Sequence, residues 1–312
     1  MPFDPGTLLA RGADQTGRRV RLLARGASLI GLLCVTATGT AGAACGDTGV
    51  SLQVLGSGGP FGAGRASAGY IVWVDGMSRV MVDAGGGTFV RFHEAGAGLT
   101  DLHLLALSHF HPDHASDVPA LLWPRGGNLL VAGPSGSTAF PSVDDFLGGL
   151  FGPRGVFRVL QDRVTLDTVT VDTTAAEPMD VLSEGRVRVR ALGVPHGNVP
   201  ALGYRVDVGD ASVAFSSDQN GSNPAFVDFV RDVDVLVVHF AGSEASSGAV
   251  TDLHAKPTVW GQMATDASVG TLVLSHVSSN QNLEENVAHL RTRYQGPLTI
   301  ASDLLCVPVE SG

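Results

Sequence analysis

The residues best suited to chemistry lie in one short segment, His109–His114, with the sequence HFHPDH. Three imidazoles and a carboxylate within six positions are typical ligands of divalent transition metals. The segment follows an apolar, strand-like run, 104–108, and precedes a helix-like run, 115–123, so we expect it on a strand-to-helix loop. A loop there can direct its first two histidines to one metal ion, and its aspartate and last histidine to a second ion about 3.5–4 Å away.

Three later residues could complete such a centre. His196, Asp218 and His276 each directly follow an apolar run that reads as a strand. The junction of a strand and a loop is where rigid scaffolds present functional groups. Each ion needs three or four protein ligands, and these residues supply them. The sequence therefore predicts a bimetallic centre in preference to a chance histidine-rich loop.

The order of these residues resembles that of the metallo-β-lactamase-fold hydrolases, whose signature is HxHxDH, a single His, a single Asp and a final His. The segment Val80–Gly87 is similar to the family's first motif, an Asp at a strand end followed by glycines. The resemblance runs from about Val50 to about Ser302. It implies an α/β fold with one domain at 45–312, built as a four-layer αββα sandwich. Alternating strand-like and helix-like runs, such as Val235–His239 and Lys256–Ala267, agree with that order.

Within this family the chain most resembles the ribonuclease Z-like group, which also holds certain bacterial arylsulfatases and phosphodiesterases. The segments Leu55–Pro60 and His196–Arg205 carry the resemblance. So does His254, which the resemblance casts as a catalytic residue that stabilises or protonates the leaving group.

Two departures from the group bear on function. Ribonuclease Z grips tRNA with an arm between its third His and its bridging Asp, but only 21 residues separate His196 from Asp218 here. The group also tends to carry a His-Glu pair where this chain has His239-Phe240, with Glu244 as the nearest carboxylate. We therefore expect no tRNA-binding arm, and the role of His239 and Glu244 in proton transfer is open.

The resemblance implies a complete ligand assignment around two zinc ions, with Mn²⁺ or Fe²⁺ as alternatives. A water shared by the ions would have its pKa lowered toward ~7 and become a bridging hydroxide nucleophile. Asp113 counts both as a ligand and as part of the catalytic centre. Two residues are expected just outside the ligands, Asp83 and His239, with turn capping and core packing as their respective alternatives. The first ion is assigned His109, His111 and His196, the second ion Asp113, His114 and His276, and both ions Asp218.

The N-terminal residues predict export. Four arginines between Arg18 and Arg25 precede a nine-residue apolar run, 27–35, and small residues follow to Ala44. This is the pattern of a secretory signal peptide over residues 1–44. Nine apolar residues cannot span a bilayer that needs ~20, so no transmembrane segment is expected after cleavage. A periplasmic or secreted protein follows, with an N-terminal membrane anchor or a lipoprotein at Cys45 as alternatives.

Two cysteines remain after such a cleavage, Cys45 and Cys306. An oxidising compartment permits a disulfide, and the termini of a domain often lie close together. We therefore predict a Cys45–Cys306 disulfide, with two free buried thiols as the alternative.

The charge balance argues against a nucleic-acid partner. Removal of residues 1–44 takes away five arginines and two aspartates, which moves the formal net charge from −10 to −13. Lys256 is the single lysine of the chain. Binding to a phosphate backbone needs clustered Lys and Arg, so a small anionic ester is the better substrate. A homodimer is the macromolecular assembly that we keep open.

The favoured function is therefore an exported dinuclear-zinc hydrolase of phosphate or sulfate esters, phosphodiesterase-like or arylsulfatase-like. The alternative is a lactone, thioester or β-lactam hydrolase on the same centre, although Asp218 disfavours the β-lactamases that use a cysteine at this place. A non-hydrolytic zinc-binding or scaffold protein is a third reading, for which an intact ligand set is a poor fit.

Overall fold

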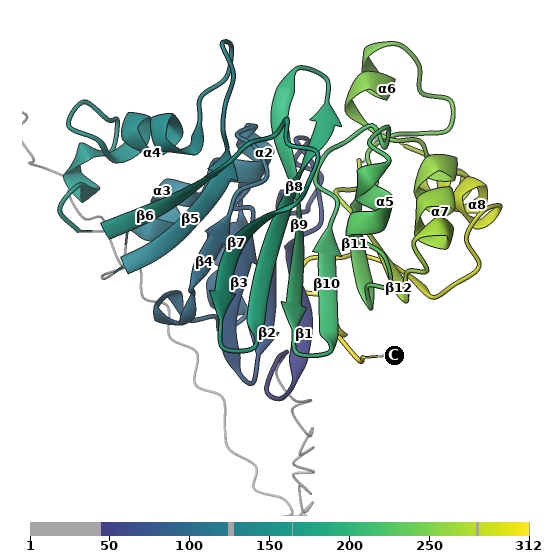
Figure 1. Cartoon of the computed structure of the whole chain (residues 1–312), viewed down its shortest axis with the longest axis horizontal. Helices are drawn as coiled ribbons and strands as arrows, with labels where there is room; N and C mark the ends of the chain where they lie inside the picture. The colour runs from purple at the N-terminus through teal and green to yellow at the C-terminus, as the bar shows by residue number, and fades with distance from the viewer. Residues whose placement is uncertain (1–44, 124–127, 164, 279–280, 312) are drawn as a thin grey trace, which may run out of the picture. The chain divides into compact units, whose positions relative to one another are not determined.

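Two mixed β-sheets form the centre of the fold, and the computed structural model describes residues 45–123, 128–163, 165–278 and 281–311 (Figure 1). The first sheet has the order β14 (Cys306–Pro308), β1 (Val50–Gly56), β2 (Gly69–Val74), β3 (Met77–Val82), β4 (Leu104–Ala106), β5 (Asn128–Pro134) and β6 (Thr165–Val171). The second has the order β13 (Leu298–Ile300), β12 (Thr271–Ser275), β11 (Val235–His239), β10 (Ala211–Phe215), β9 (Val199–Val208), β8 (Val187–His196) and β7 (Met179–Glu184).

Both sheets change from antiparallel to parallel pairing partway across. In the second sheet β8, β9 and β10 pair antiparallel, and β10, β11 and β12 pair parallel. Strand β8 therefore runs in the same direction as β10, β11 and β12. In the first sheet β3 and β4 are also parallel neighbours. The carboxyl ends of parallel strands lie along one edge of a sheet, which is where ligand sites form in such folds.

Side chains of alternate strand positions fill two different layers. In β11, Val235 and Val237 join the core between the sheets, while Leu236 and Val238 join the outer core beneath the helices. A strand that is buried on both faces reads as a continuous apolar run, which explains why the sequence predicts it well.

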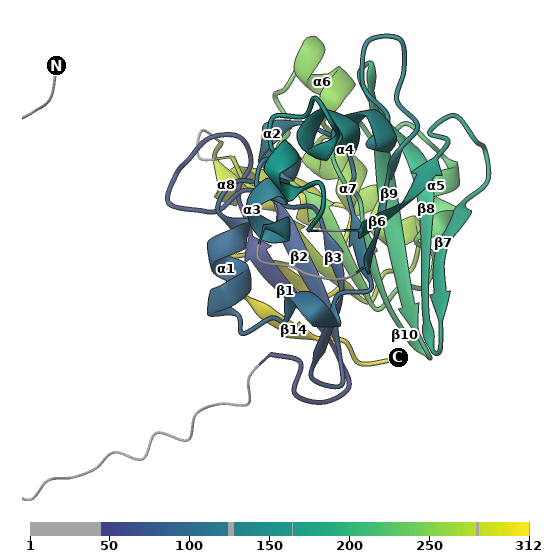
Figure 2. The same ribbon diagram turned by 90° about the vertical axis from the view of Figure 1, so that its left-hand side faces the viewer.

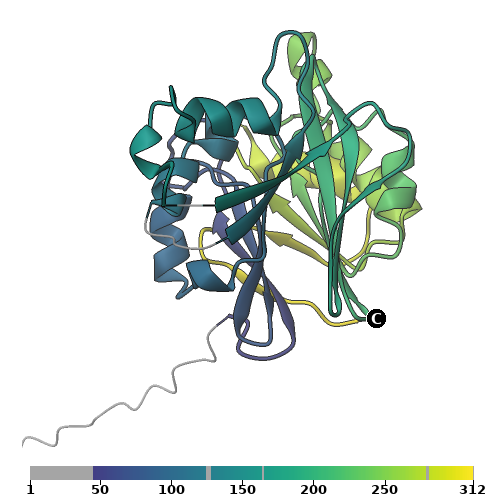
Figure 3. The same cartoon turned by 60° about the vertical axis from the view of Figure 1, so that its left-hand side comes forward.

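Helices cover the outer face of each sheet (Figures 2 and 3). Side chains of α1, α3 and α4 pack on the first sheet, and those of α5, α7 and α8 pack on the second. Ser142 begins α4 with a reciprocal capping box to Asp145. The αββα sandwich is thus confirmed. The helices are α1 (Thr88–Glu94), α2 (Pro112–Ala115), α3 (Val118–Leu122), α4 (Val143–Phe151), α5 (Ala225–Phe229), α6 (Ala249–Leu253), α7 (Pro257–Asp266) and α8 (Leu283–Arg291).

The predicted Cys45–Cys306 disulfide is confirmed. It joins the segment that precedes β1 to the first residue of β14. It is compatible with an oxidising compartment. The predicted signal peptide, residues 1–44, lies outside the described residues. Among the described residues, no helix has both the length and the apolar character needed to cross a bilayer.

Candidate metal centre

The HFHPDH segment is partly helical, which corrects the expectation that it lies wholly on a loop. Helix α2 begins at Pro112, so Asp113 and His114 lie in its first turn. The expected single helix up to Trp123 is two helices, because the chain breaks between α2 and α3. At the break the Asp117 N–H donates to Ala84 O at 2.9 Å, and its carboxylate accepts from the Gly87 N–H at 2.8 Å. These bonds to the loop after β3 replace the bonds of a continuous helix.

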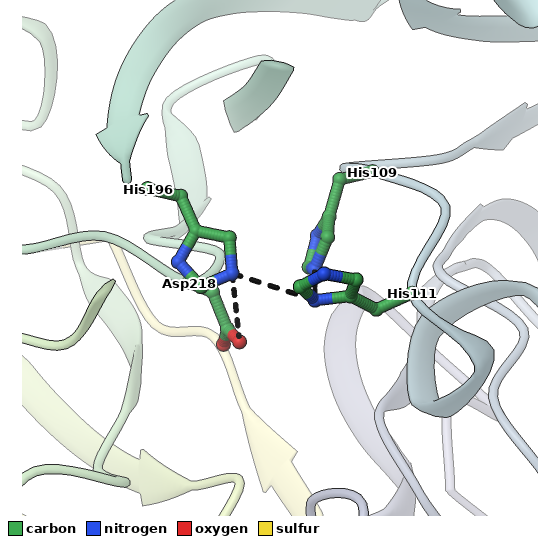
Figure 4. Close-up of side chains that lie close together, drawn as sticks. All are labelled: His109, His111, His196 and Asp218. Atoms are coloured by element: carbon green, nitrogen blue, oxygen red, sulfur yellow. Dashed lines mark hydrogen bonds and ion pairs between the residues drawn. The ribbon is translucent and has the colours of Figure 1, made fainter. Parts of the chain in front are cut away.

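We call His109, His111 and His196, together with Asp218, the first ligand group (Figure 4). The ligand atoms of these four residues all lie within 4.8 Å of one another. His109 Nε2 is 3.0 Å and His196 Nε2 is 3.5 Å from His111 Nδ1. His196 Nε2 also lies 3.8 Å from Asp218 Oδ2. Four donor atoms from the two sheets thus converge on one point.

The second ligand group consists of Asp113, His114 and His276, again with Asp218. His276 Nε2 lies 3.1 Å from Asp113 Oδ2 and 3.3 Å from His114 Nε2. Asp218 reaches this group as well, with Oδ1 3.5 Å from His276 Nε2 and Oδ2 3.6 Å from His114 Nε2. The structure therefore brings all seven predicted ligand residues together, with Asp218 between the two groups.

His239 also lies within ligand distance of the second group, but both of its ring nitrogens are engaged. Its Nδ1 is 2.8 Å from Asp218 Oδ1, and its Nε2 is 3.1 Å from the Tyr70 hydroxyl. The Tyr70 hydroxyl also lies 3.0 Å from Ser275 Oγ. His239 thus orients Asp218 instead of offering a free lone pair. The sequence indicated His239 but not Tyr70, which looks like any aromatic residue of a buried strand.

Hydrogen bonds on the outer side fix how three of the histidines face inward. Asp83 accepts from His114 Nδ1 at 2.8 Å and from the Ser108 N–H at 2.7 Å, so it both orients a ligand and ties the loop. His196 Nδ1 donates to Leu253 O at 2.9 Å. His109 Nδ1 lies 3.1 Å from Ser108 Oγ. Such partners set the tautomer and ring orientation of metal-binding histidines.

Strand ends turn sharply to present these side chains. Asp83, Ser217 and His276 have φ angles of 57°, 57° and 54°, which are uncommon for residues other than glycine. They follow β3, β10 and β12, respectively. Backbone strain of this kind persists where the surrounding structure enforces it, as at functional sites.

The protonation states suit metal binding. Burial lowers the pKa of His109 well below its usual value and that of His196 to about 4. Burial would raise the pKa of Asp218, but His276 and His114 outweigh it and hold that pKa well below its usual range. Burial likewise opposes ionisation of Asp113, yet its hydrogen bond to His276 brings its pKa to about 2.

The pKa of His114 shifts in the opposite direction from the pKa values of His109 and His196. Burial would lower its pKa, but Asp218 and Asp83 outweigh burial and raise it well above the usual value. Buried carboxylates here thus attract positive charge to the point where the second group converges. The lowered pKa values of His109, His111 and His196 and the ionised carboxylates fit divalent metal ions, and a bound ion would take the place of the proton on His114.

The sequence profile described as "Beta-lactamase superfamily domain" matches residues 78–277. The chain belongs to the β-lactamase superfamily. It is 28% identical to an uncharacterised protein of Mycobacterium tuberculosis over 80% of this chain and 88% of that protein. It is also 28% identical to a protein named ribonuclease Z from Kineococcus radiotolerans, over 78% of this chain and 90% of the relative.

The superfamily fold is seen in solved structures too. The metallo-β-lactamase-fold protein YhfI of Bacillus subtilis matches with a TM-score of 0.67 and 20% identity, over 83% of this chain and 98% of that one. The profile match, this fold and the His/Asp cluster together identify a metal-dependent hydrolase of the metallo-β-lactamase fold.

In this superfamily hydrolase, His254 lies at the rim of the cluster, directly after α6. Its Nδ1 is 3.9 Å from Asp218 Oδ2, and its ring centroid is 5.4 Å from that of His196. Its side chain is 18% exposed, and Nδ1 has no hydrogen-bond partner within the described part of the chain. Glu244 instead accepts from the Thr258 N–H at 3.1 Å, where α7 begins. His254 is therefore the candidate proton donor that faces the site.

An apolar hollow of about 530 Å³ lies on the other side of the same motif. Phe110, Pro112 and Ala115 contribute to its wall, and Phe146 stacks on Phe110 with ring centroids 4.4 Å apart. Helix α2 thus carries two ligands, while its residues Pro112 and Ala115 line the apolar hollow and Phe110, just before it, packs on α4.

Proposed function

We propose that this protein is an exported dinuclear-zinc hydrolase of phosphate or sulfate esters, similar in activity to phosphodiesterases or arylsulfatases. The observation that carries the proposal is the position of Asp218, whose Oδ2 lies 3.8 Å from His196 Nε2 of the first ligand group and 3.6 Å from His114 Nε2 of the second. A single carboxylate between two sets of imidazoles is the arrangement that a pair of ions would share.

In this proposal the first ligand group would hold one zinc ion and the second group another, with Asp218 available to both. When bound, the ions would lower the pKa of a water toward neutrality and offset charge on the ester in the transition state. Imidazole and carboxylate ligands suit zinc, and manganese or iron are the alternatives.

The chain's own residues would then orient the metal ligands and donate a hydrogen bond to the leaving group. His239 holds the Asp218 carboxylate, and Asp83 holds the His114 ring, so both groups keep their orientation during turnover. Burial lowers the pKa of His254, so its ring is neutral at pH 7. A neutral imidazole at the rim can donate a hydrogen bond to the departing oxygen, which is the catalytic role that we propose for His254.

A small anionic ester is favoured over tRNA, although several relatives are named ribonuclease Z. The interval between His196 and Asp218 consists of β9, β10 and their turns, which leaves no length for a binding arm. The chain carries a formal net charge of −10, whereas affinity for nucleic acid comes from basic clusters. The disulfide supports an extracytoplasmic location, and cleavage after about residue 44 belongs to the same proposal.

A panel of chromogenic substrates tests the reaction class. Zinc-loaded protein is given an aryl sulfate, an aryl phosphate diester, a cyclic nucleotide, a lactone, a thioester and a β-lactam, with precursor tRNA alongside. We expect the highest kcat/KM for a phosphate or sulfate ester, and none after chelation. Faster cleavage of the lactone, thioester or β-lactam would instead establish the alternative class, and cleavage of precursor tRNA would overturn the small-substrate proposal.

Light scattering on the same preparation measures the oligomeric state, for which a homodimer stays a prediction.

A further inference from the structure

His276 differs from the other buried histidines of the two ligand groups. The outer nitrogens of His109, His114 and His196 each lie within hydrogen-bond distance of a partner. The outer nitrogen of His276, Nδ1, is buried and has no such partner among the described residues. Its backbone is also in the left-handed region, with φ of 54°. Because no hydrogen bond to Nδ1 fixes the ring, packing must do so.

The ring of His276 packs against the glycine loop that follows β1. A Cβ atom added to Gly59 would lie only 2.7 Å from His276 Cε1 and 3.0 Å from Nδ1, so only glycine allows this approach. The ring also stacks on His239, with centroids 4.8 Å apart and an interplanar angle of 14°. Next to it, the Val277 N–H donates to Ser57 O at 2.9 Å. The position of the loop therefore determines the position of the ring.

One carboxylate, that of Asp303, closes this loop at both ends. Its Oδ1 accepts from the N–H and the hydroxyl of Ser57, at 3.1 and 2.8 Å. Its Oδ2 accepts from the Ala66 N–H at 2.8 Å and lies 3.3 Å from Arg91 Nε. Ala66 O in turn accepts from the Gly58 N–H at 2.9 Å. The side chain of Asp303 is only 12% exposed, so water is a poor substitute for it.

We infer that Asp303 is a positioning residue for the second metal ion, acting through the Ser57–Gly59 loop on His276. The inference rests on the proposed dinuclear centre and adds a residue from the C-terminal segment to it. Loss of the carboxylate removes the three hydrogen bonds that tie Ser57 and Ala66 to Asp303, so the loop holds the His276 ring less firmly. The second ligand group then binds its ion more weakly, while the first group, which Asp303 does not contact, is unchanged. Comparable changes outside metal ligands weaken metal binding about 10- to 100-fold.

Zinc titration of metal-free protein by calorimetry tests this without any substrate. The test variant is Asp303→Asn, and Asp234→Asn is the matched control. Asp234 holds the N–H and hydroxyl of Ser212 at 2.7 and 2.9 Å, in the same way, but where β10 begins, at the end opposite to the site. We expect two ions in the wild type and in Asp234→Asn. In Asp303→Asn the second ion should bind at least about tenfold more weakly, and excess zinc should restore kcat.

A second pair of variants tests the loop directly and applies even if Asp303→Asn does not fold. Gly59→Ala places a methyl group against His276, and Gly62→Ala, in the same loop, meets nothing within 4 Å. We expect weaker binding of the second ion in Gly59→Ala alone. His276→Ala gives the reference value for a protein without that ligand.

Three results separate the possibilities. Wild-type affinity for both ions in Asp303→Asn or in Gly59→Ala would overturn the inference. Equal weakening of both ions in Asp303→Asn would show a general structural role and overturn it as well. A wild type that binds a single ion would instead refute the proposed dinuclear centre.

Discussion

The two sheets supply their ligands in different ways. From the first sheet come His109, His111, Asp113 and His114, which all lie in one segment between β4 and the end of α2. From the second come His196, which ends β8, and Asp218 and His276, which follow β10 and β12. The first set depends mainly on local structure, whereas the second set exists only when the whole sheet has formed. Metal binding should therefore be coupled to the assembly of the second sheet more than to that of the first.

The largest effect is expected at the residue that joins the two sets. Asp218→Ala removes a ligand from both groups, and His111→Ala removes one from the first. Each should abolish turnover of the best substrate and lower the zinc content below two ions per chain, with the far-UV circular dichroism largely kept. The matched control is His93→Ala, an exposed histidine of α1 that packs on Phe89, which should behave as the wild type. Turnover that survives in either site variant contradicts the assignment.

His254 belongs to neither set, and its removal separates chemistry from metal binding. We expect His254→Ala to lower kcat by about 10²- to 10³-fold, the range for loss of a general acid or hydrogen-bond donor, with both ions retained. His289→Ala in α8 is the control. The measurement combines steady-state kinetics with metal analysis of the same samples. If His254→Ala loses one ion per chain, the residue is a ligand and its catalytic role is wrong.

Removal of the disulfide tests how firmly the segment that passes from the second sheet to the first is held. The chain leaves β13 in the second sheet and enters β14 in the first, where Cys306 is bonded to Cys45 across 261 positions of sequence. Closure of so long a loop restrains the unfolded chain by about 5–6 kcal/mol in the entropy description. Replacing both cysteines with serine should lower the free energy of unfolding in urea by up to that amount, with kcat unchanged at 25 °C. Alkylation of both thiols in the unreduced wild type would contradict the disulfide.

The same contrast explains what could be predicted from the sequence. The ligand residues could be predicted, because metal binding requires particular side chains and the HFHPDH segment is unusual. The buried strand Val235–His239 could be predicted as well, because a strand that is buried on both faces has a continuous apolar run. Strand β6 (Thr165–Val171) has no such apolar run, because it is mostly exposed and polar. Partners such as Leu253 O and Asp303 could not be identified either, since a backbone carbonyl or one more aspartate acquires its role only through tertiary contact.

The smallest effect is expected at Tyr70, a residue of the first sheet whose hydroxyl contacts the second sheet. Tyr70 in β2 contacts His239 and Ser275, so its hydroxyl supports the residue that orients Asp218. Tyr70→Phe keeps the ring and its packing on Phe215, with centroids 5.4 Å apart in the wild type, but leaves His239 Nε2 without its partner. An unsatisfied buried polar group costs about 1–3 kcal/mol, so the free energy of unfolding should fall by that much.

The catalytic consequence distinguishes support from packing. Because His239 Nδ1 can still donate to Asp218, Tyr70→Phe should lower kcat only a few-fold and leave both ions bound. Tyr204→Phe is the control, since that hydroxyl is equally buried but donates to Leu107 O at 3.0 Å, away from Asp218. Suppose that both variants lose stability while only Tyr70→Phe lowers kcat. The ligands of the second sheet then depend on the first sheet for their orientation as well as for their burial. Equal kcat in the two variants would mean that the second sheet positions Asp218 without help from Tyr70.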